Sequence, residues 1–267
     1  MQNIVITGAA GFIGSALANN LSTNNESRII LIDSLEYGNV KNLKKELRES
    51  LIVTNCLNLN LLEEIIPNES VIFHFAGISS LPECESNYTS SINNIFNSTV
   101  NVYEIGVKKN MKKFIFASTS AVYENNNNYP FKEDFHVSPD LMYSYSKKIS
   151  EDYLKFRALK LDLQNTYILR FFNVFGYNQD AVRKTPPLTA YLIDCLINNK
   201  TAHIYNDNPK IKRDYIFIDD LIEVFHYIIK SKINPKLELL NISSGNSYSV
   251  EEIISILNQL TSKKLKL

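Results

Sequence analysis

Tyr143 and Lys147 stand four residues apart in the stretch Tyr-Ser-Tyr-Ser-Lys, and Thr119 precedes them in the chain. On a helix, residues i and i+4 lie on one face, so the phenol and the ammonium can point into the same cleft. A phenol beside a cation can move a proton while a hydroxyl holds the reacting oxygen, as hydride-transfer chemistry requires. The spacing alone is more typical of a surface pair on a helix. The predicted catalytic group is Thr119, Tyr143 and Lys147.

The chemistry of this group sets a condition on its surroundings. A free tyrosine has a pKa of about 10, so work near pH 7 requires roughly 4 kcal/mol of help to the phenolate. A cation at about 4 Å supplies roughly 4 kcal/mol at an effective dielectric constant of about 20, but only about 1 kcal/mol in bulk water. The pair therefore makes chemical sense only in a closed, partly dry site. Thr119 follows an apolar run, at the carboxyl end of an expected strand, where open α/β sheets bind ligands.

A glycine-rich turn opens the chain, and it holds three of the eight glycines. It lies between an expected strand and an expected helix, the context in which this spacing indicates a dinucleotide site. Glycine permits the tight turn and the close approach of backbone to a pyrophosphate, which the positive helix N-terminus attracts. The predicted contacts of this loop with the cofactor are Gly8, Gly11, Phe12, Ile13 and Gly14.

Asp33 ends the second apolar run, 19 positions after Gly14. This is the place expected for a carboxylate that accepts hydrogen bonds from the ribose hydroxyls of the adenosine. A carboxylate there would repel a 2′-phosphate, so the pattern favours NAD over NADP. A helix cap or a turn is the alternative role for Asp33.

Short apolar runs alternate with helical patterns through the first part of the chain. Strands buried on both faces are expected at 4–7, 28–33, 71–76, 114–118 and 166–171, and helices at 12–22, 92–109 and 143–161. This alternation predicts an α/β fold, a Rossmann-type doubly wound parallel sheet with a smaller mixed C-terminal substrate lobe. The expected domains are 1–173, binding NAD, and 174–267, binding the substrate, with 212–230 packing back on the first. In the lobe we expect helices at 188–199, 218–230 and 250–261 and a strand at 202–205.

Composition narrows the classes of function. The 28 basic and 28 acidic residues give no electrostatic argument for nucleic acid or an anionic membrane as a partner. No apolar run is long enough to span a bilayer, and no secretory leader pattern is present. Cys56, Cys84 and Cys195 are few and scattered, which is typical of a reducing cytoplasm. No cluster has metal-ligand spacing, so no metal is expected, and His74 is interpreted as a hydrogen-bonded core residue.

At this point the chain resembles a known family, the extended short-chain dehydrogenases/reductases of the NAD-dependent epimerase/dehydratase group. The resemblance covers nearly the whole chain. Its carriers are residues 7–14, 74–77, 93–94, 118–123, the Tyr143/Lys147 pair, 169–176 and 213–216.

The resemblance implies roles for individual residues. Tyr143 would be the acid/base, Thr119 its hydrogen-bond partner, and Lys147 a ligand of the cofactor ribose that tunes Tyr143. Asn173 and Arg213 would hold the diphosphate of a nucleotide-sugar substrate, for which the planar guanidinium fork is suited. Further residues beside the NAD cofactor would be Phe75, Ala76, Gly77 and Asn94.

The residues after Thr119 select within the family. Relatives that dehydrate or decarboxylate tend to carry acids there, whereas this chain has Ser120 and Ala121. The chain is thus similar to the epimerases typified by UDP-glucose 4-epimerase, which oxidise and re-reduce C4 of a UDP-hexose through a 4-keto sugar. A 4-ketosugar reductase, or a dehydratase, is the alternative, and a catalytically silent NAD-binding scaffold is an alternative of another class. The resemblance also suggests a homodimer formed by helices 92–109 and 143–161.

Three departures from the family pattern stand out. The adenine-side aspartate is replaced by the sequence Asn55-Cys56-Leu57-Asn58, and Glu124 replaces the glycine after Val-Tyr. The chain reaches Leu267 without the further arginine and aspartate that many relatives place over the substrate. This last departure supports the scaffold hypothesis, while the intact Thr119, Tyr143 and Lys147 oppose it.

Overall fold

The computed structural model describes residues 1–23, 26–161, 165–204, 211–233, 235–261 and 263–267. Contacts divide the chain into two compact units, of which the first comprises Met1–Phe171 and Ile222–Ile242, and the second Phe172–Leu221 and Ser243–Leu267. Part of the segment 212–230 thus belongs to the first unit. The cofactor and substrate roles expected for the two parts stay predictions.

The first unit is built on a parallel sheet of seven strands in the order β3-β2-β1-β4-β5-β6-β9. The order reverses between β1 and β4, which is the switch point where such sheets bind ligands. This arrangement confirms the predicted Rossmann-type fold. The strands are β1 (Gln2–Thr7), β2 (Ser27–Asp33), β3 (Leu51–Val53), β4 (Val71–His74), β5 (Lys113–Thr119), β6 (Thr166–Phe171) and β9 (Leu237–Ile242).

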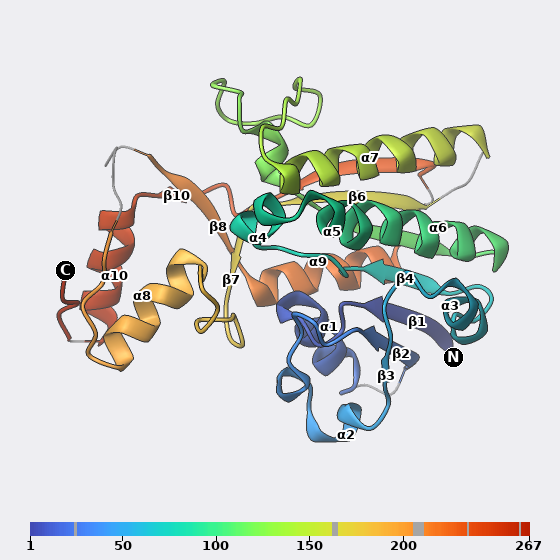
Figure 1. Ribbon diagram of the computed structural model, residues 1–267, viewed down its shortest axis with the longest axis horizontal. Helices are drawn as coiled ribbons and strands as arrows, with labels where there is room; N and C mark the ends of the chain where they lie inside the picture. The colour runs from blue at the N-terminus through green and yellow to red at the C-terminus, as the bar shows by residue number, and fades with distance from the viewer. Residues whose placement is uncertain (24–25, 162–164, 205–210, 234, 262) are drawn as a thin grey trace. The chain divides into compact units, whose positions relative to one another are not determined.

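Helices cover both faces of this sheet (Figure 1). One face carries α3 (Leu59–Ile65), α6 (Ser98–Lys108) and α7 (Met142–Lys160), and the other carries α1 (Phe12–Leu21) and the part of α9 (Ile218–Lys230) in this unit. Shorter elements are α2 (Lys45–Arg48), α4 (Leu81–Ser86), α5 (Tyr88–Ser91), the 3-10 helices Val40–Asn42 and Ser120–Tyr123, and the π-helix Ile92–Asn97.

The second unit contains a sheet of three strands in the order β10-β8-β7. Its elements are β7 (Asn173–Phe175), α8 (Leu188–Ile197), β8 (Arg213–Phe217), β10 (Ser247–Tyr248) and α10 (Val250–Thr261). The strand expected at 202–205 is wrong for residues 202–204, which are irregular, and residue 205 lies outside the described residues. The short apolar run there instead buries Ala202 in a small core with Leu192 and Leu265.

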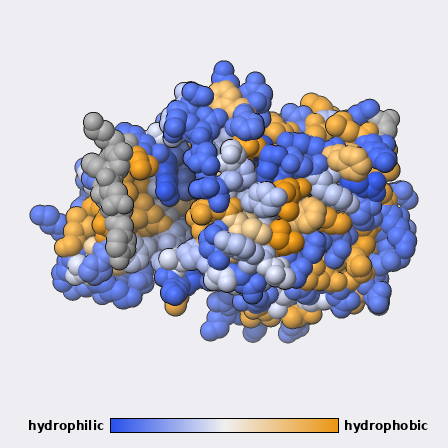
Figure 2. Space-filling view, turned by 45° about the horizontal axis from the view of Figure 1, so that its top comes forward, coloured by the Kyte–Doolittle hydropathy of each residue, from blue (hydrophilic) through white to orange (hydrophobic). Residues whose placement is uncertain are grey.

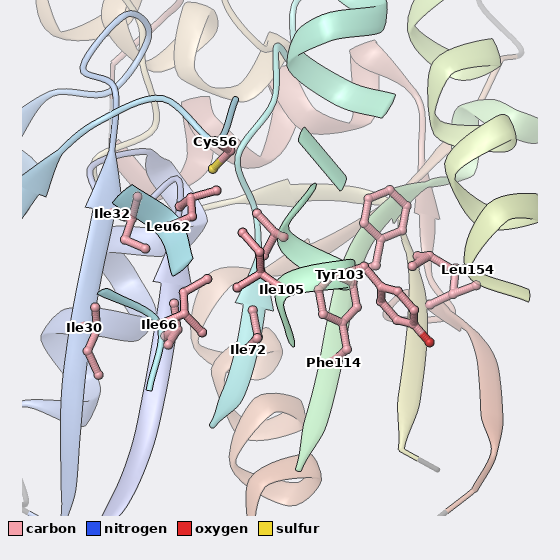
Figure 3. Packing of buried hydrophobic residues seen from close by; sticks show 14 residues of the cluster. Ile30, Ile32, Cys56, Leu62, Ile66, Ile72, Tyr103, Ile105, Phe114 and Leu154 are labelled. Carbon is pink, nitrogen blue, oxygen red and sulfur yellow. The ribbon is translucent and has the colours of Figure 1, made fainter. Parts of the chain in front are cut away.

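The main core fills the space between the sheet and the helices α3, α6 and α7. Figure 3 shows Ile72 and Phe114 of the sheet among side chains such as Tyr103 of α6 and Leu154 of α7. The strand segments 4–7, 71–74 and 113–119 are buried throughout, because helices cover both faces. At the surface in Figure 2, hydrophobic residues lie among hydrophilic ones.

Replacing Phe114 by alanine tests how much this core contributes. The ring is fully buried, with its centroid 4.9 Å from that of Tyr103. We expect F114A to lose roughly 3–5 kcal/mol of unfolding free energy, from lost transfer energy and the cavity left behind. Urea denaturation followed by circular dichroism measures the loss. Tyr227, 67% exposed, is the control, and Y227A should cost less than about 1 kcal/mol. Equal losses in the two variants would contradict this assignment of the core.

Candidate active site

The glycine loop is shaped by close backbone approach. Gly8 has a φ of +68°, and a Cβ there would lie 2.8 Å from the backbone nitrogen of Ala76. A Cβ on Gly14 would lie 2.1 Å from the carbonyl oxygen of Gly8, so no other residue fits without moving the loop. The N-cap of α1 is Gly11, which offers no side-chain cap, and the first turn has no acidic residue. An uncapped helix N-terminus beneath a glycine turn fits a pyrophosphate.

Asp33 lies at the end of β2 beside this loop. One carboxylate oxygen accepts from the backbone N–H of Ala10 at 2.9 Å and the other from that of Leu35 at 2.8 Å. The carboxylate therefore also stabilises the turn after β2, which is the alternative role that the sequence suggested for Asp33. Each oxygen retains a second lone pair, so the orientation imposed by the loop leaves acceptors for a ribose diol.

The end of β4 is tied to the end of β1. Phe75 N–H donates to the carbonyl oxygen of Thr7 at 3.1 Å, and Ala76 N–H donates to the Thr7 hydroxyl at 3.3 Å. The same hydroxyl lies 2.8 Å from Nδ1 of His74, which is fully buried. Burial, aided by the charge of Lys147, lowers the pKa of His74 to about 3, so the ring is neutral. Its hydrogen bonds, burial and neutral ring agree with its interpretation as a core residue.

Lys147 brings a cation into this interior. Its ammonium donates to the Ala117 carbonyl oxygen of β5 at 2.7 Å and lies 4.9 Å from the centre of the Phe116 ring. A Cβ on Gly77 would lie 3.8 Å from this nitrogen and 3.6 Å from the carbonyl oxygen of Asn94. Three predicted cofactor residues, Gly77, Asn94 and Lys147, therefore meet at one point. Burial lowers the pKa of Lys147 to about 8, so the group is mostly charged at pH 7 in a dry environment.

Asn94 reaches this point from the π-helix Ile92–Asn97. Its side-chain amide donates to Ser90, to the carbonyl oxygen and to the hydroxyl, each at 3.1 Å. Short π-helical turns are frequently found at functional sites, because the widened turn re-aims a backbone carbonyl. The sequence predicts a cofactor role for Asn94, but it did not predict the π-helix that carries this residue.

Thr119 and Tyr143 complete the predicted catalytic group. Thr119, 8% exposed, is the last residue of β5, and its hydroxyl accepts from the N–H of Ala121. That hydroxyl keeps its own proton and a lone pair for another partner. Tyr143 lies in the first turn of α7, half-buried against the apolar cluster of Ile78, Cys84 and Ile95.

A buried ion pair, which the sequence analysis missed, lies one turn beyond Lys147. Glu151 accepts two hydrogen bonds from the guanidinium of Arg170, at 2.9 and 2.7 Å, and one from the Ser118 hydroxyl at 2.5 Å. Burial acts to raise the pKa of Glu151, but its bonds and charge contact with Arg170 outweigh this, and the pKa is lowered. The sequence did contain an indication of this pair, because an arginine inside a mainly apolar strand is buried only when an acidic residue pairs with it.

Asn173 and Arg213 lie in the second unit, on neighbouring strands of its sheet. Asn173 of β7 pairs with Tyr215 of β8, and Arg213 is two residues before Tyr215, so the register puts both predicted residues on one face. Arg213 is exposed. The Asn173 amide donates to the backbone oxygen of Asp214 at 2.8 Å, which leaves its carbonyl oxygen to be used elsewhere.

Two further features are absent from the described part of the chain. Within it, no group of three or more His, Cys, Asp or Glu side chains could hold a metal ion. No helix among the described residues has both the length and the apolar character needed to cross a membrane.

Comparison with known proteins gives consistent results. Residues 4–243 match the model of the NAD dependent epimerase/dehydratase family. A putative UDP-glucose 4-epimerase of Methanocaldococcus jannaschii is 29% identical, over 95% of this chain and 81% of that protein. A dTDP-D-glucose 4,6-dehydratase of Dictyostelium discoideum is 32% identical, over 99% of this chain and 62% of that protein.

Solved structures show the same likeness. The UDP-N-acetylglucosamine 4-epimerase from Methanobrevibacter ruminantium, in complex with UDP-N-acetylmuramic acid, superposes with a TM-score of 0.91. It is 28% identical, with 100% of this chain and 84% of that chain covered. The UDP-glucose 4-epimerase from Thermotoga maritima, with UDP-glucose, has a TM-score of 0.89 at 26% identity, covering 100% and 85% of the two chains.

The buried Lys147 predicts a pH dependence of stability. Its folded pKa of about 8 lies below its unfolded value of 10.5, so between these pH values the unfolded chain binds more protons. The free energy of unfolding should therefore rise with pH over this window, relative to K147M, with a slope of up to about 1.4 kcal/mol per unit. Urea denaturation of both cofactor-free proteins measures the difference, in which the other titrating groups cancel. A difference independent of pH would show that Lys147 is not desolvated.

Proposed function

This chain belongs to the NAD-dependent epimerase/dehydratase family, and from that membership we propose that it epimerises a UDP-hexose at C4. The observation that carries the proposal is the end of β5, where Thr119 is followed by Ser120 and Ala121 in a 3-10 helix. The dehydratase relatives need an acid to remove water. Here no carboxylate stands beside the hydroxyl in the sequence, which argues against a dehydration.

NAD is the cofactor, and the residues present fit it. The glycine loop and the uncapped N-terminus of α1 suit its pyrophosphate, and Asp33 suits the adenosine diol. We assign its nicotinamide side to Gly77, Asn94 and Lys147, which meet where β4, the π-helix and α7 approach each other. When bound, NAD would supply the hydride acceptor for C4 of the sugar and, once reduced, the hydride donor.

Tyr143 moves the proton that accompanies this exchange. Its phenolate removes the proton of the sugar 4-hydroxyl and returns it after the 4-keto sugar has turned over. We assign Lys147 to stabilising the phenolate. Its burial strengthens this effect, because a cation at about 4 Å is worth roughly 4 kcal/mol at an effective dielectric constant near 20 but only about 1 kcal/mol in water. The Thr119 hydroxyl holds the reacting oxygen in line. These roles are our assignment.

The substrate must be held by its nucleotide and left free at its sugar. Asn173 and Arg213 share one face of the small sheet, and Arg213 is exposed, so we assign them to the diphosphate. Anchoring at the diphosphate fits a mechanism in which the sugar turns over between the two hydride transfers.

A relative named for another reaction supports a second candidate function, that of a 4-ketosugar reductase. A dTDP-4-dehydro-6-deoxyglucose reductase of Escherichia coli is 28% identical over 98% of this chain and 83% of that protein. A reductase also needs no acid beside the hydroxyl, so the epimerase and the reductase are distinguished only by whether NADH is consumed.

A cytoplasmic location is predicted from the three free, buried cysteines, which are typical of a reducing compartment.

The C4-epimerase proposal is tested with a panel of substrates. The purified protein should interconvert UDP-glucose with UDP-galactose, or their N-acetylamino counterparts, without accumulating NADH. NMR of the sugar anomeric region measures both epimers. Y143F should retain bound NAD and lose about 10²–10⁴ in kcat, the usual worth of a general acid/base.

The controls separate the alternatives. Y145F alters an exposed tyrosine two residues away on α7 and should keep its rate. Consumption of NADH in proportion to a 4-keto sugar would show a reductase. Bound NAD with no product from any of the four UDP-sugars would refute the epimerase and favour a silent scaffold.

The homodimer stays a prediction with its own test. Helix α7 exposes Phe156 at 58% and Leu159 at 63%, three residues apart on one face, and we propose that this face meets a second copy. Sedimentation velocity should show a dimer for the wild type and a monomer for L159E, because a charge cannot be buried there unpaired. I233E, at a 66% exposed site outside the α7 face, should remain a dimer. A monomeric wild type at micromolar concentration would contradict the proposal.

A further inference from the structure

Helix α7 begins without a cap of its own. Its N-cap residue is Leu141, whose side chain makes no capping hydrogen bond, and its first turn has no acidic residue. The first amides of any helix lack partners within it and must find them elsewhere. Tyr143 lies in this first turn, so whatever satisfies these amides also fixes the position of the phenol.

Two carboxylates from distant parts of the chain accept from backbone N–H groups at this end of the helix, among them those of Leu141 and Met142. Glu124 follows the 3-10 helix after β5, and one of its oxygens accepts from the N–H groups of Asp140 at 3.0 Å and Leu141 at 3.3 Å. Glu85 of α4 accepts from the N–H of Met142 at 2.5 Å. Tyr88 donates its hydroxyl to the other oxygen of Glu85 at 3.2 Å and orients it.

The bonds enclose Tyr143 on both sides. The residue before it, Met142, is held through its backbone by Glu85, and the residue after it, Ser144, donates its hydroxyl to Glu124 at 2.8 Å. The two carboxylates also interact favourably with the positive end of the helix dipole, which strengthens their hold on the start of α7.

Glu124 further connects Tyr143 to Thr119. The Thr119 hydroxyl accepts from the N–H of Ala121, and the carbonyl oxygen of Ala121 accepts from the N–H of Glu124 at 3.1 Å. The path from the Thr119 hydroxyl to the first turn of α7 is therefore a short chain of hydrogen bonds. It bypasses the loop between residues 125 and 139.

We propose that Glu124, with Glu85, is a positioning residue that holds Tyr143 at its working distance from Thr119. The proposal rests on the proposed function for its kinetic part only. A misplacement of about 1 Å at a reacting group can cost roughly 10²-fold in rate, so loss of one of two anchors is expected to cost less than this. E124A should lower kcat about tenfold and leave KM within about twofold, because neither carboxylate is assigned to the substrate.

Three variants separate positioning from general stability. E124Q keeps an acceptor oxygen for the same donors and should recover kcat to within about threefold of wild type. E252A removes a carboxylate that accepts from Ser249 N–H at the start of α10, in the second unit, and should lower Tm without changing kcat. E85A/E124A should lose more kcat than either single variant.

Amide hydrogen exchange tests the attachment without any turnover. In E124A the amides of residues 140–144 should exchange at least about tenfold faster, and in E124Q and E252A they should not. If the wild type has no epimerase activity, the proposed function fails, and this exchange pattern alone supports the anchoring. Unchanged exchange in E124A overturns it. In an active enzyme, faster exchange with unchanged kcat, or an equal kcat loss in E252A, also overturns it.

Discussion

The buried ion pair between Arg170 and Glu151 is the interaction on which the arrangement of the site depends. Both side chains are almost completely excluded from solvent, and together they join β6 to α7, with Ser118 adding β5. A buried pair repays its desolvation only when its geometry is good and its remaining groups are bonded, and removing one partner typically costs about 3–5 kcal/mol. The pair therefore permits essentially one placement of α7 over the sheet, and that placement is what brings Lys147 to the carbonyl of Ala117.

This constraint allows the fold to bury a charged group, the Lys147 ammonium, at the proposed active site. Lys147 would be more stable in water, and burial lowers its pKa to about 8, so the fold carries a cost there. The nearby charge of Glu151 acts in the opposite direction and helps to keep the ammonium protonated. Sites that break the ordinary rules of burial are commonly functional, because stability elsewhere supports them. The acid of the ion pair thus has two effects, one on the position of the helix and one on the charge of its lysine.

The sequence predicted most of the sheet because its strands are continuous apolar runs and its glycine loop has a fixed spacing. It did not predict β3, which has only three residues, or β9, in which Glu238 and Asn241 interrupt the apolar residues. It proposed Thr119, Tyr143 and Lys147 as a catalytic group, which stays a prediction, and it did not point to Glu151, Glu85 or Glu124. Their roles depend on which segments meet in space. For Asp33, the sequence predicted the place at the end of the strand but not the hydrogen bond that its carboxylate accepts from Ala10.

The site is therefore held together by two kinds of contact that differ in strength. Beneath it, the Arg170–Glu151 pair is dry, so its energy depends little on salt. At its rim, Glu85 and Glu124 are exposed to solvent, so their hold on the first turn of α7 is weaker and more easily changed. In the function that we propose, the buried pair fixes the placement of α7 and Lys147, and the two carboxylates at the rim set the position of Tyr143.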